Sequence, residues 1–272
     1  MRGYVAIEGN IGAAKSTLVE ALRASSAVLS EVGVVGVLEE PLATWEPYLK
    51  AFYDAPGSST AAMALQMEIL RSRLQQLLDV PNIPEPSVTR SDILIIERSI
   101  ESSKHVFLRS LSESGTIQAS DASAYNAWYD TVLKALQKRV FSDVEHGDNS
   151  ANSSTESPLL GVFYLDVSPE TCLERSRTRM RDSESNLDMT FVRQLDEVYK
   201  DWLSSPPFSV ASSSSSSSSP YSSSSFCPAS IPVHIMKVSG TEFETDKEAF
   251  KKQGVAEMLS FLSTSCLECR RA

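Results

Sequence analysis

The sequence predicts an α/β fold with three layers, in which helices cover both faces of a five-stranded parallel sheet. Five short apolar runs rich in β-branched residues have the pattern of strands: 4–7, 32–38, 93–96, 159–165 and 231–238. Helical patterns separate several of these runs, and strands that alternate with helices are typical of parallel crossovers. Ligands of such sheets bind at the carboxyl ends of the strands.

The first predicted strand, 4–7, leads into a loop of small residues at 8–17 and then into an amphipathic helix. The loop is close to the pattern G-x-x-x-x-G-K-[ST], whose backbone N–H groups, lysine and hydroxyl bind phosphates and Mg²⁺. Gly9, Lys15 and Ser16 fit it, but Ala14 stands where the pattern has glycine. A Cβ at a position that needs positive φ costs roughly 1–2 kcal/mol. The alternative, an ordinary strand-to-helix turn, is disfavoured by the strand and helix on either side.

Charged residues follow the second and third predicted strands. Glu40 follows the strand 32–38, and Pro41 ends that strand with a carboxylate beside Trp45. A general base fits there, although in isolation a solvated turn with a core tryptophan is the better explanation. Glu97 and Arg98 directly follow the strand 93–96. Phosphoryl transfer needs both a Mg²⁺ ligand and a cation near the γ-phosphate, so this pair indicates a functional role.

The helical patterns cover 60–78, 122–140 and 169 to about 202, the last with a break near 182–187. Arginines at 175, 177, 179 and 181 form two rows on this last segment, because residues four apart share a helix face. Such rows are usually solvated. In a chain with a net charge of −10, however, four cations in seven residues before a polar break indicate a mobile lid over phosphates.

The composition argues against several classes of protein. A net charge of −10 disfavours nucleic-acid and anionic-membrane surfaces, which need clustered Lys and Arg. Neither a membrane span nor a signal or organelle presequence is apparent, so we expect a cytoplasmic protein, or a mitochondrial one if the gene model lacks a presequence. The four cysteines are too few for a disulfide framework, and the Cys266-x-x-Cys269 pair lacks the second pair of a zinc site.

Residues 206–230 interrupt the alternation of strands and helices. They include eight consecutive serines at 212–219 and too few apolar residues to offset the entropy of ordering. We therefore expect a single domain, 1–272, interrupted by a disordered serine-rich insert at 206–230.

These motifs, in this order and spacing, resemble those of the deoxyribonucleoside kinase family over nearly the whole chain outside the insert. The matching segments are Glu8-Gly-Asn-Ile-Gly before the lysine, Glu40-Pro-x-x-x-Trp45, Glu97-Arg-Ser99, Arg179-x-Arg181 with Glu184 beyond it, and Val238-Ser-Gly-Thr-Glu-Phe243. The resemblance implies the fold of P-loop nucleoside triphosphate hydrolases with an arginine-rich lid. It also implies transfer of the γ-phosphate of ATP, with Mg²⁺, to the 5′-hydroxyl of a deoxynucleoside in nucleotide salvage, by an enzyme that is commonly a homodimer.

The resemblance also implies roles for individual residues. Glu40 would accept the proton of the 5′-hydroxyl, while Lys15, Arg98, Arg179 and Arg181 would stabilise the transferring phosphoryl group. The residues that would bind the nucleotide are Gly9, Asn10, Ile11, Gly12, Ala13, Ala14, Lys15, Ser16, Thr17, Arg175, Arg179, Thr241, Glu242 and Phe243. Ser16 and Glu97 would bind Mg²⁺. The residues that would bind the nucleoside are Glu40, Trp45, Tyr53, Gln66, Arg73, Arg98, Ser103, Phe107 and Glu184.

Within that set, the Gln66 amide would pair with the base edge, Trp45 and Phe107 would flank the base, and Tyr53 and Glu184 would bind the 3′-hydroxyl. Members that prefer deoxycytidine or purines tend to pair an arginine at position 73 with an aspartate at position 103, and thymidine-leaning members have neither. Because this chain has Arg73 with Ser103, we expect a deoxycytidine or purine preference.

Two other functions stay open. Nucleoside monophosphate kinases share the fold but typically have Asp-Arg where this chain has Glu97-Arg98, and they lack the Glu-Pro-x-x-x-Trp element. A catalytically silent nucleotide-binding protein is the second alternative, because Ala14 departs from the phosphate-loop pattern.

Overall fold

The computed structural model describes residues 3–79, 93–140, 158–179, 186–210, 230–239 and 246–266. Within them, six strands form one sheet in the order β2-β3-β1-β4-β6-β5, and every neighbouring pair is parallel. The strands are β1 (Gly3–Gly9), β2 (Val34–Leu38), β3 (Ile93–Glu97), β4 (Leu159–Asp166), β5 (Phe208–Val210) and β6 (Ile231–Lys237). The predicted α/β class and parallel sheet are confirmed.

The sheet has one strand more than the five predicted, because β5 forms within the segment predicted as a disordered insert. Phe208–Val210 pairs with β6, and the N–H of Ile231 donates to the carbonyl of Pro207 at 2.8 Å. The prediction that the insert begins at 206 is therefore wrong. Phe208 packs edge-on against Trp202 with 5.0 Å between ring centroids, a contact that the serine-dominated sequence window conceals. The serine run 212–219 lies outside the described residues.

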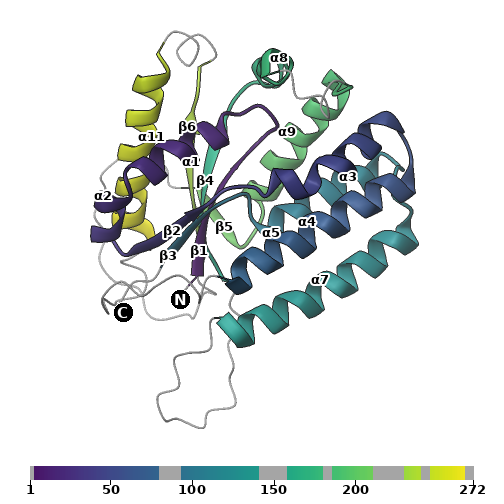
Figure 1. The fold of residues 1–272 in the computed structure, drawn as a ribbon, viewed down its shortest axis with the longest axis horizontal. Coiled ribbons are helices and arrows are strands. Elements are labelled where there is room, and N and C mark those ends of the chain that lie inside the picture. The colour runs from purple at the N-terminus through teal and green to yellow at the C-terminus, as the bar shows by residue number, and fades with distance from the viewer. Residues whose placement is uncertain are drawn as a thin grey trace, which may run out of the picture.

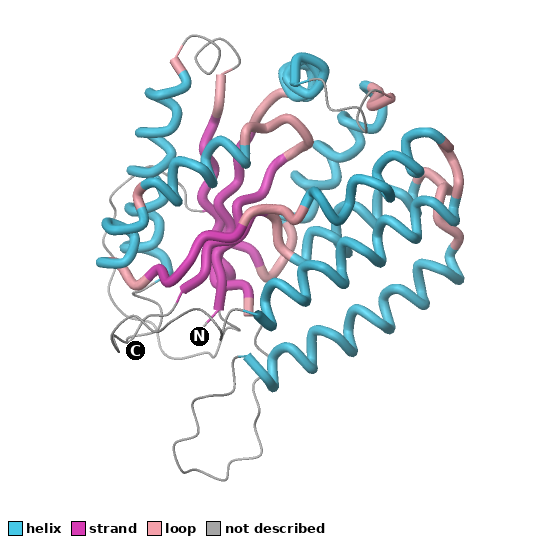
Figure 2. Tube along the Cα trace, in the orientation of Figure 1, coloured by secondary structure: helices cyan, strands magenta, loops and turns pink. Residues whose placement is uncertain are grey.

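Helices cover both faces of the sheet (Figure 1). The helical elements are α1 (Lys15–Ala24), α2 (Ser26–Glu31), α3 (Leu42–Asp54), α4 (Ser59–Asp79), α5 (Ile100–Ser102), the π-helical η2 (Ser103–Leu108), α6 (Arg109–Glu113), α7 (Ala119–Val140), α8 (Pro169–Arg179), α9 (Met189–Ser204), α11 (Lys247–Phe261) and η4 (Leu262–Cys266). In Figure 1, α1 and α11 lie on one side of the strands, and α4, α7 and α9 lie on the other. Figure 2 shows the same arrangement as one twisted sheet between two sets of helices.

Successive side chains of the central strands belong alternately to two hydrophobic cores, one on each face of the sheet. In β1, Tyr4 and Ala6 belong to the core shared with α4, α7 and α9, whereas Val5 and Ile7 belong to the core shared with α1 and α11. All four side chains are fully buried. Successive side chains of a strand point to opposite faces, so a continuously apolar strand is what a sheet covered on both faces requires.

The predicted helices at 60–78 and 122–140 are confirmed as α4 and α7, and the predicted segment from 169 to about 202 divides into α8 and α9. No helix was predicted over α3. It follows Pro41 directly and contains Pro47 within its second turn, and proline is an unfavourable residue inside a helix. Trp45 and Tyr53 are its two buried side chains, so packing rather than local propensity stabilises it.

Candidate active site

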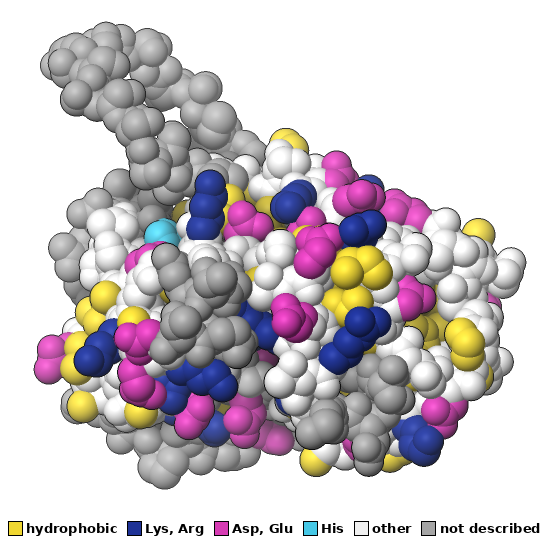
Figure 3. All heavy atoms as spheres, turned by 90° about the horizontal axis from the view of Figure 1, so that it is seen from above, with side chains coloured by type: hydrophobic (Ala, Val, Ile, Leu, Met, Phe, Trp, Pro, Cys, Tyr) yellow, Lys and Arg dark blue, Asp and Glu magenta, His cyan; other side chains and the backbone are white. Residues whose placement is uncertain are grey.

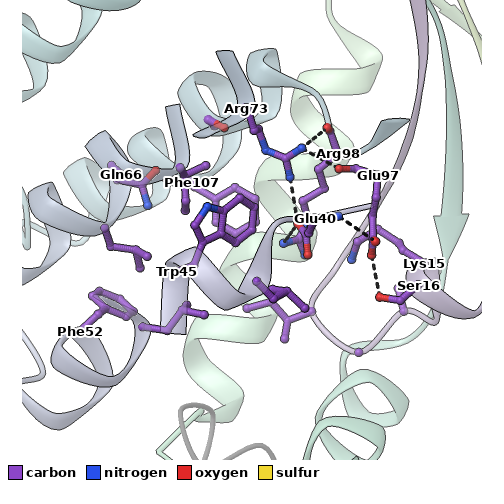
Figure 4. A pocket seen from close by; sticks show the side chains of 18 of the residues that line it. Lys15, Ser16, Glu40, Trp45, Phe52, Gln66, Arg73, Glu97, Arg98 and Phe107 are labelled. Atoms are coloured by element: carbon purple, nitrogen blue, oxygen red, sulfur yellow. Dashed lines mark hydrogen bonds and ion pairs between the residues drawn. The ribbon is translucent and has the colours of Figure 1, made fainter. Parts of the chain in front are cut away.

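A cavity of about 190 Å³ lies at the carboxyl ends of β1, β2 and β3. One end is formed by the loop between β1 and α1, and the other by α3, α4 and η2 (Figure 4). Figure 3 views the molecule from above Figure 1 and shows Lys and Arg side chains interspersed with Asp and Glu side chains on this face. The position is where parallel α/β sheets bind their ligands.

The loop after β1 has the geometry of a phosphate-binding turn. Ala14 has φ 69° and ψ 21°, so the residue in place of glycine does occupy the left-handed region, at a cost of roughly 1–2 kcal/mol. Gly12 also has positive φ, and a Cβ there would lie 2.1 Å from the carbonyl oxygen of Cys172. Glycine is therefore required at position 12 by both conformation and space.

Lys15 is almost completely buried beneath this loop. Its ammonium group donates to the carbonyl oxygens of Gly9 at 3.1 Å and Asn10 at 2.7 Å. The Asn10 side chain in turn donates to the carbonyl of Val192 in α9 at 2.8 Å, which ties the loop to that helix. Burial and the nearby charge of Arg98 lower the pKa of Lys15 to about 8. A neighbouring anion would therefore stabilise the charged form of Lys15.

Ser16 and Glu97 place a hydroxyl and a carboxylate next to each other near the lysine (Figure 4). The Ser16 hydroxyl donates to Oε1 of Glu97 at 2.8 Å, and the N–H of Glu40 lies 3.4 Å from Oε2. Burial, together with the charge of Glu40, raises the pKa of Glu97 above its usual range. The described residues contain no group of three or more His, Cys, Asp or Glu side chains able to hold a metal. One carboxylate and one hydroxyl suit Mg²⁺ that is also bound to substrate phosphates.

The Glu40 carboxylate lies between two guanidinium groups. Its Oε1 accepts from Nη2 of Arg73 at 3.0 Å and from Nη1 of Arg98 at 3.1 Å. The Glu40 side chain is only 7% exposed. Figure 4 shows the three side chains converging from the end of β2, from α4 and from the end of β3. The two cations stabilise the negative charge of the carboxylate, which is the form that can accept a proton.

The far end of the cavity has an aromatic wall and a buried amide. The Trp45 indole N–H donates to the Ser72 hydroxyl at 2.7 Å, which fixes the ring. Gln66 is 2% exposed, and its Oε1 has no hydrogen-bond partner among the residues that the structure describes. A buried polar atom without a partner is costly, so this acceptor indicates a ligand that donates a hydrogen bond. Phe52, also shown in Figure 4, closes the apolar side.

Most of the predicted site residues meet in this one cavity. Its lining includes Ile11, Gly12, Ala13, Ala14, Lys15, Ser16, Thr17, Glu40, Trp45, Tyr53, Gln66, Arg73, Glu97, Arg98, Ser103, Phe107 and Arg179. Gly9 and Asn10 contribute the carbonyls that accept hydrogen bonds from Lys15. Arg175 lies half-buried on α8 and is not part of the cavity lining. Five of the predicted site residues lie outside the described part of the chain: Arg181, Glu184, Thr241, Glu242 and Phe243.

The sequence reasoning missed several apolar residues that line the cavity: Leu42, Leu49, Phe52, Leu65, Ile69, Leu111 and Phe191. On α3, Trp45, Leu49 and Phe52 follow one another at helical spacing. Recognition of that helix would have brought Leu49 and Phe52 to the same face as the tryptophan. Phe191 comes from α9, which is distant in sequence, and no local pattern marks it.

Within the part of the chain that the structure describes, no helix is both long and apolar enough to cross a bilayer.

Comparison with known proteins agrees with the geometry. Residues 5–260 match the family model for deoxynucleoside kinase. The chain is 26% identical to deoxycytidine kinase 2 of Gallus gallus over 73% of this chain and 73% of the relative. It is 30% identical to deoxyguanosine kinase of Dictyostelium discoideum, over 73% of this chain and 58% of the relative. It is 25% identical to the mitochondrial thymidine kinase 2 of Homo sapiens, over 74% of this chain and 64% of the relative. The family match begins within β1 and covers the other five strands, so the resemblance in the motifs is confirmed: the chain belongs to the deoxynucleoside kinase family.

Proposed function

We propose that the protein transfers the γ-phosphate of ATP, with Mg²⁺, to the 5′-hydroxyl of a deoxynucleoside. The observation that carries this proposal is the Glu40 carboxylate, held 3.0 Å from Arg73 and 3.1 Å from Arg98 inside one cavity. That cavity runs from the phosphate loop to the buried amide oxygen of Gln66, which no described residue hydrogen-bonds. A proton acceptor between a phosphate site and a buried hydrogen-bonding group suits phosphorylation of a nucleoside hydroxyl.

The donor side of the reaction rests on the loop and its lysine. The backbone N–H groups of 9–17 and the Lys15 ammonium would bind the β- and γ-phosphates, and the N-terminus of α1 favours negative charge there. Ser16 and Glu97 would hold Mg²⁺, which neutralises phosphate charge when bound. Arg179, which lines the cavity from the end of α8, would approach the phosphates as part of an arginine-rich lid.

The acceptor side rests on Glu40. As the bond forms between the 5′-oxygen and the γ-phosphorus, the bond from that phosphorus to the β–γ bridging oxygen breaks and ADP leaves. The proton of the 5′-hydroxyl passes to the Glu40 carboxylate. Arg98, which already contacts Glu40, would stabilise charge on the transferring group. The protein contributes mainly position and electrostatics.

For the nucleoside, we propose that the Gln66 amide pairs with the base edge between Trp45 and Phe107. The relatives named above carry the names of deoxycytidine, deoxyguanosine and thymidine kinases, so their names do not agree on a base. Our expectation of deoxycytidine or a purine rests on Arg73. Its Nη atoms contact Glu40 and two backbone carbonyls, and its buried Nε has no hydrogen-bond partner within the described part of the chain.

We further propose a single domain that acts as a homodimer in the cytoplasm and binds no nucleic acid. The single domain is supported by the sheet, because both cores pack on the same central strands. Analytical ultracentrifugation of the purified chain checks the dimer, with a monomer at micromolar concentration as the contrary result.

The decisive experiment measures phosphoryl transfer from Mg-ATP to the four deoxynucleosides and to dTMP. We expect turnover on a nucleoside, and loss of that turnover in Glu40→Gln with the fold intact. The matched control is Glu39→Gln, which alters the neighbouring glutamate, whose exposed carboxylate pairs with Arg23. A clear preference for dTMP would instead favour a nucleoside monophosphate kinase. Silence of the folded wild type on every acceptor would favour a nucleotide-binding protein without activity.

A further inference from the structure

Arg98 holds its side chain at the site from an unusual backbone conformation. Its φ is 58°, in the left-handed region that non-glycine residues rarely adopt. From this conformation the guanidinium reaches Glu40 at 3.1 Å and lies over the Phe107 ring, 4.8 Å from its centroid. Strain of this kind persists only where the surrounding structure holds it in place.

The peptide group after Arg98 is held at both of its polar atoms. The carbonyl oxygen of Arg98 accepts from Nη1 of Arg73 at 2.6 Å. The N–H of Ser99, at the other side of the same peptide, donates to Oε1 of Glu8 at 2.7 Å. The N–H of Arg98 itself donates to the carbonyl of Ile7 at 2.9 Å. Fixing the plane of the peptide from 98 to 99 fixes ψ of Arg98, and the Ile7 contact restrains its φ.

Glu8 makes this contact from a position outside the cavity lining. Its side chain lies at the end of β1 with 0% exposure. Besides the Ser99 N–H, it accepts from the Ser99 hydroxyl at 2.7 Å and from the Tyr199 hydroxyl at 3.0 Å. A buried carboxylate that receives three hydrogen bonds is held rigidly, because each bond lost would leave an unsatisfied group.

The same carboxylate links the arginine to α9. Tyr199 is fully buried on that helix and packs edge-on against Phe107, with 6.3 Å between centroids and an interplanar angle of 89°. Phe107 in turn supports the Arg98 guanidinium. Glu8 therefore holds the backbone of Arg98 directly, and its partner Tyr199 supports the ring under the side chain.

We propose that Glu8 is a positioning residue for phosphoryl transfer. Together with Arg73, it holds the peptide between Arg98 and Ser99, so that the Arg98 side chain stays directed at Glu40. This inference rests on the proposed kinase function. Without Glu8, Arg98 would relax into an ordinary backbone region and its guanidinium would leave Glu40.

The kinetic test is a double-mutant cycle. We expect Glu8→Ala to lower kcat by about 10²-fold with little change in nucleoside KM, since misplacement of a catalytic group by an ångström has that effect. In an Arg98→Ala background, the same substitution should lower the residual kcat by less than about threefold, because both changes remove one function. Glu8→Gln should recover most of the activity, since its amide oxygen can still accept from the Ser99 N–H. Glu101→Ala, which removes another buried carboxylate bonded to a buried tyrosine, is the control and should retain kcat.

A second variant tests the backbone directly and does not depend on Glu8→Ala folding. Ser99 has φ −84°, close to the value that proline fixes, so Ser99→Pro should fit there. Proline removes the N–H that binds Glu8 and disfavours helical conformations of the preceding residue. We expect a kcat loss like that of Glu8→Ala, whereas Ser99→Ala, which keeps the N–H, should lose far less. Full activity in Ser99→Pro would overturn the proposal.

Equal losses from Glu8→Ala in the wild-type and Arg98→Ala backgrounds would also overturn it, because a general structural defect would act in both. A crystal structure of Glu8→Ala provides a readout independent of turnover. Retention of positive φ at Arg98 would refute the proposal even if the wild type phosphorylates nucleosides. If the wild type is inactive, the proposed function fails, and departure of Arg98 from the left-handed region would still support the positioning role.

Discussion

Two non-glycine residues at this site, Ala14 and Arg98, share the same unfavourable backbone region but differ in what their side chains do. Ala14 has φ 69° and its methyl group makes no cap hydrogen bond for α1. Arg98 has φ 58°, and its guanidinium contacts Glu40. Strain at position 98 places a guanidinium that would stabilise the transferring phosphoryl group in the proposed reaction, whereas a glycine at position 14 would supply the same loop without strain. The difference separates functional strain from strain that the protein merely tolerates.

The largest expected effect comes from Arg98→Ala. It removes a cation beside Glu40, so we expect kcat to fall by about 10²–10³-fold, the loss typical of one transition-state donor. Steady-state kinetics with Mg-ATP and the preferred nucleoside check this. Arg109→Ala, which removes an arginine of α6 paired with Glu113, is the matched control and should leave kcat unchanged. A loss below tenfold in Arg98→Ala would mean that position 98, like position 14, carries tolerated strain.

Gly12→Ala should disrupt the phosphate loop far more than Ala14 does. The added Cβ would lie 2.1 Å from the Cys172 carbonyl oxygen, and φ at position 12 is +82°. We expect the free energy of unfolding to fall by about 2 kcal/mol or more, from clash and strain together. Gly57→Ala is the control, since φ there is +81° and no atom of the described residues lies within 4 Å of the new Cβ. Similar losses in both variants, measured by urea unfolding, would show that strain alone accounts for the effect.

The phosphate loop should also respond to pH through Lys15. Burial and Arg98 lower the pKa of Lys15 to about 8, so the ammonium is charged below that pH and loses its charge as the pH rises through it. We expect the Kd for ATP to rise above pH 8, approaching about tenfold per pH unit for a single required proton. Titration of ATP binding between pH 7 and 9.5 measures this. Lys15→Arg should flatten the profile, and an equally flat profile in the wild type would contradict the assignment.

The smallest effect should come from Ala14→Gly. Relief of left-handed strain gains roughly 1–2 kcal/mol, and the greater freedom of glycine in the unfolded chain offsets about 0.4–1 kcal/mol of it. We therefore expect a net gain between about 0 and about 1.6 kcal/mol in the free energy of unfolding. Ala13→Gly, at a fully buried neighbour outside the left-handed region, should destabilise instead. If Ala14→Gly also destabilises, the methyl group has a packing role in the cavity lining.

Local patterns predicted much of the molecule because the relevant information is contiguous. The first strand, the loop and α1 follow one another in the sequence, so apolar runs and small residues were enough to place them and to identify Ala14 as the departure from the phosphate-loop pattern. The same reasoning missed α3, which follows one proline and contains another, because proline is unfavourable inside a helix. It also missed β5, because a strand of only three residues next to a serine run gives no recognisable pattern. Both elements form because of distant packing partners, which local propensity does not register.

The sequence by itself determined five of the six strands, the phosphate loop with the helix after it, and the carboxylates and arginines that follow the strands, because each of these depends on neighbouring residues. The tertiary structure alone decided which of them meet. Glu40 contacts Arg73 and Arg98 across 33 and 58 residues, and Glu8 contacts Ser99 across 91. Such contacts arise only when parallel strands bring their carboxyl ends to one edge of the sheet. The tertiary structure also decided the left-handed conformation of Arg98. Arginine disfavours this conformation, but hydrogen bonds from two elements distant in the sequence hold it in place.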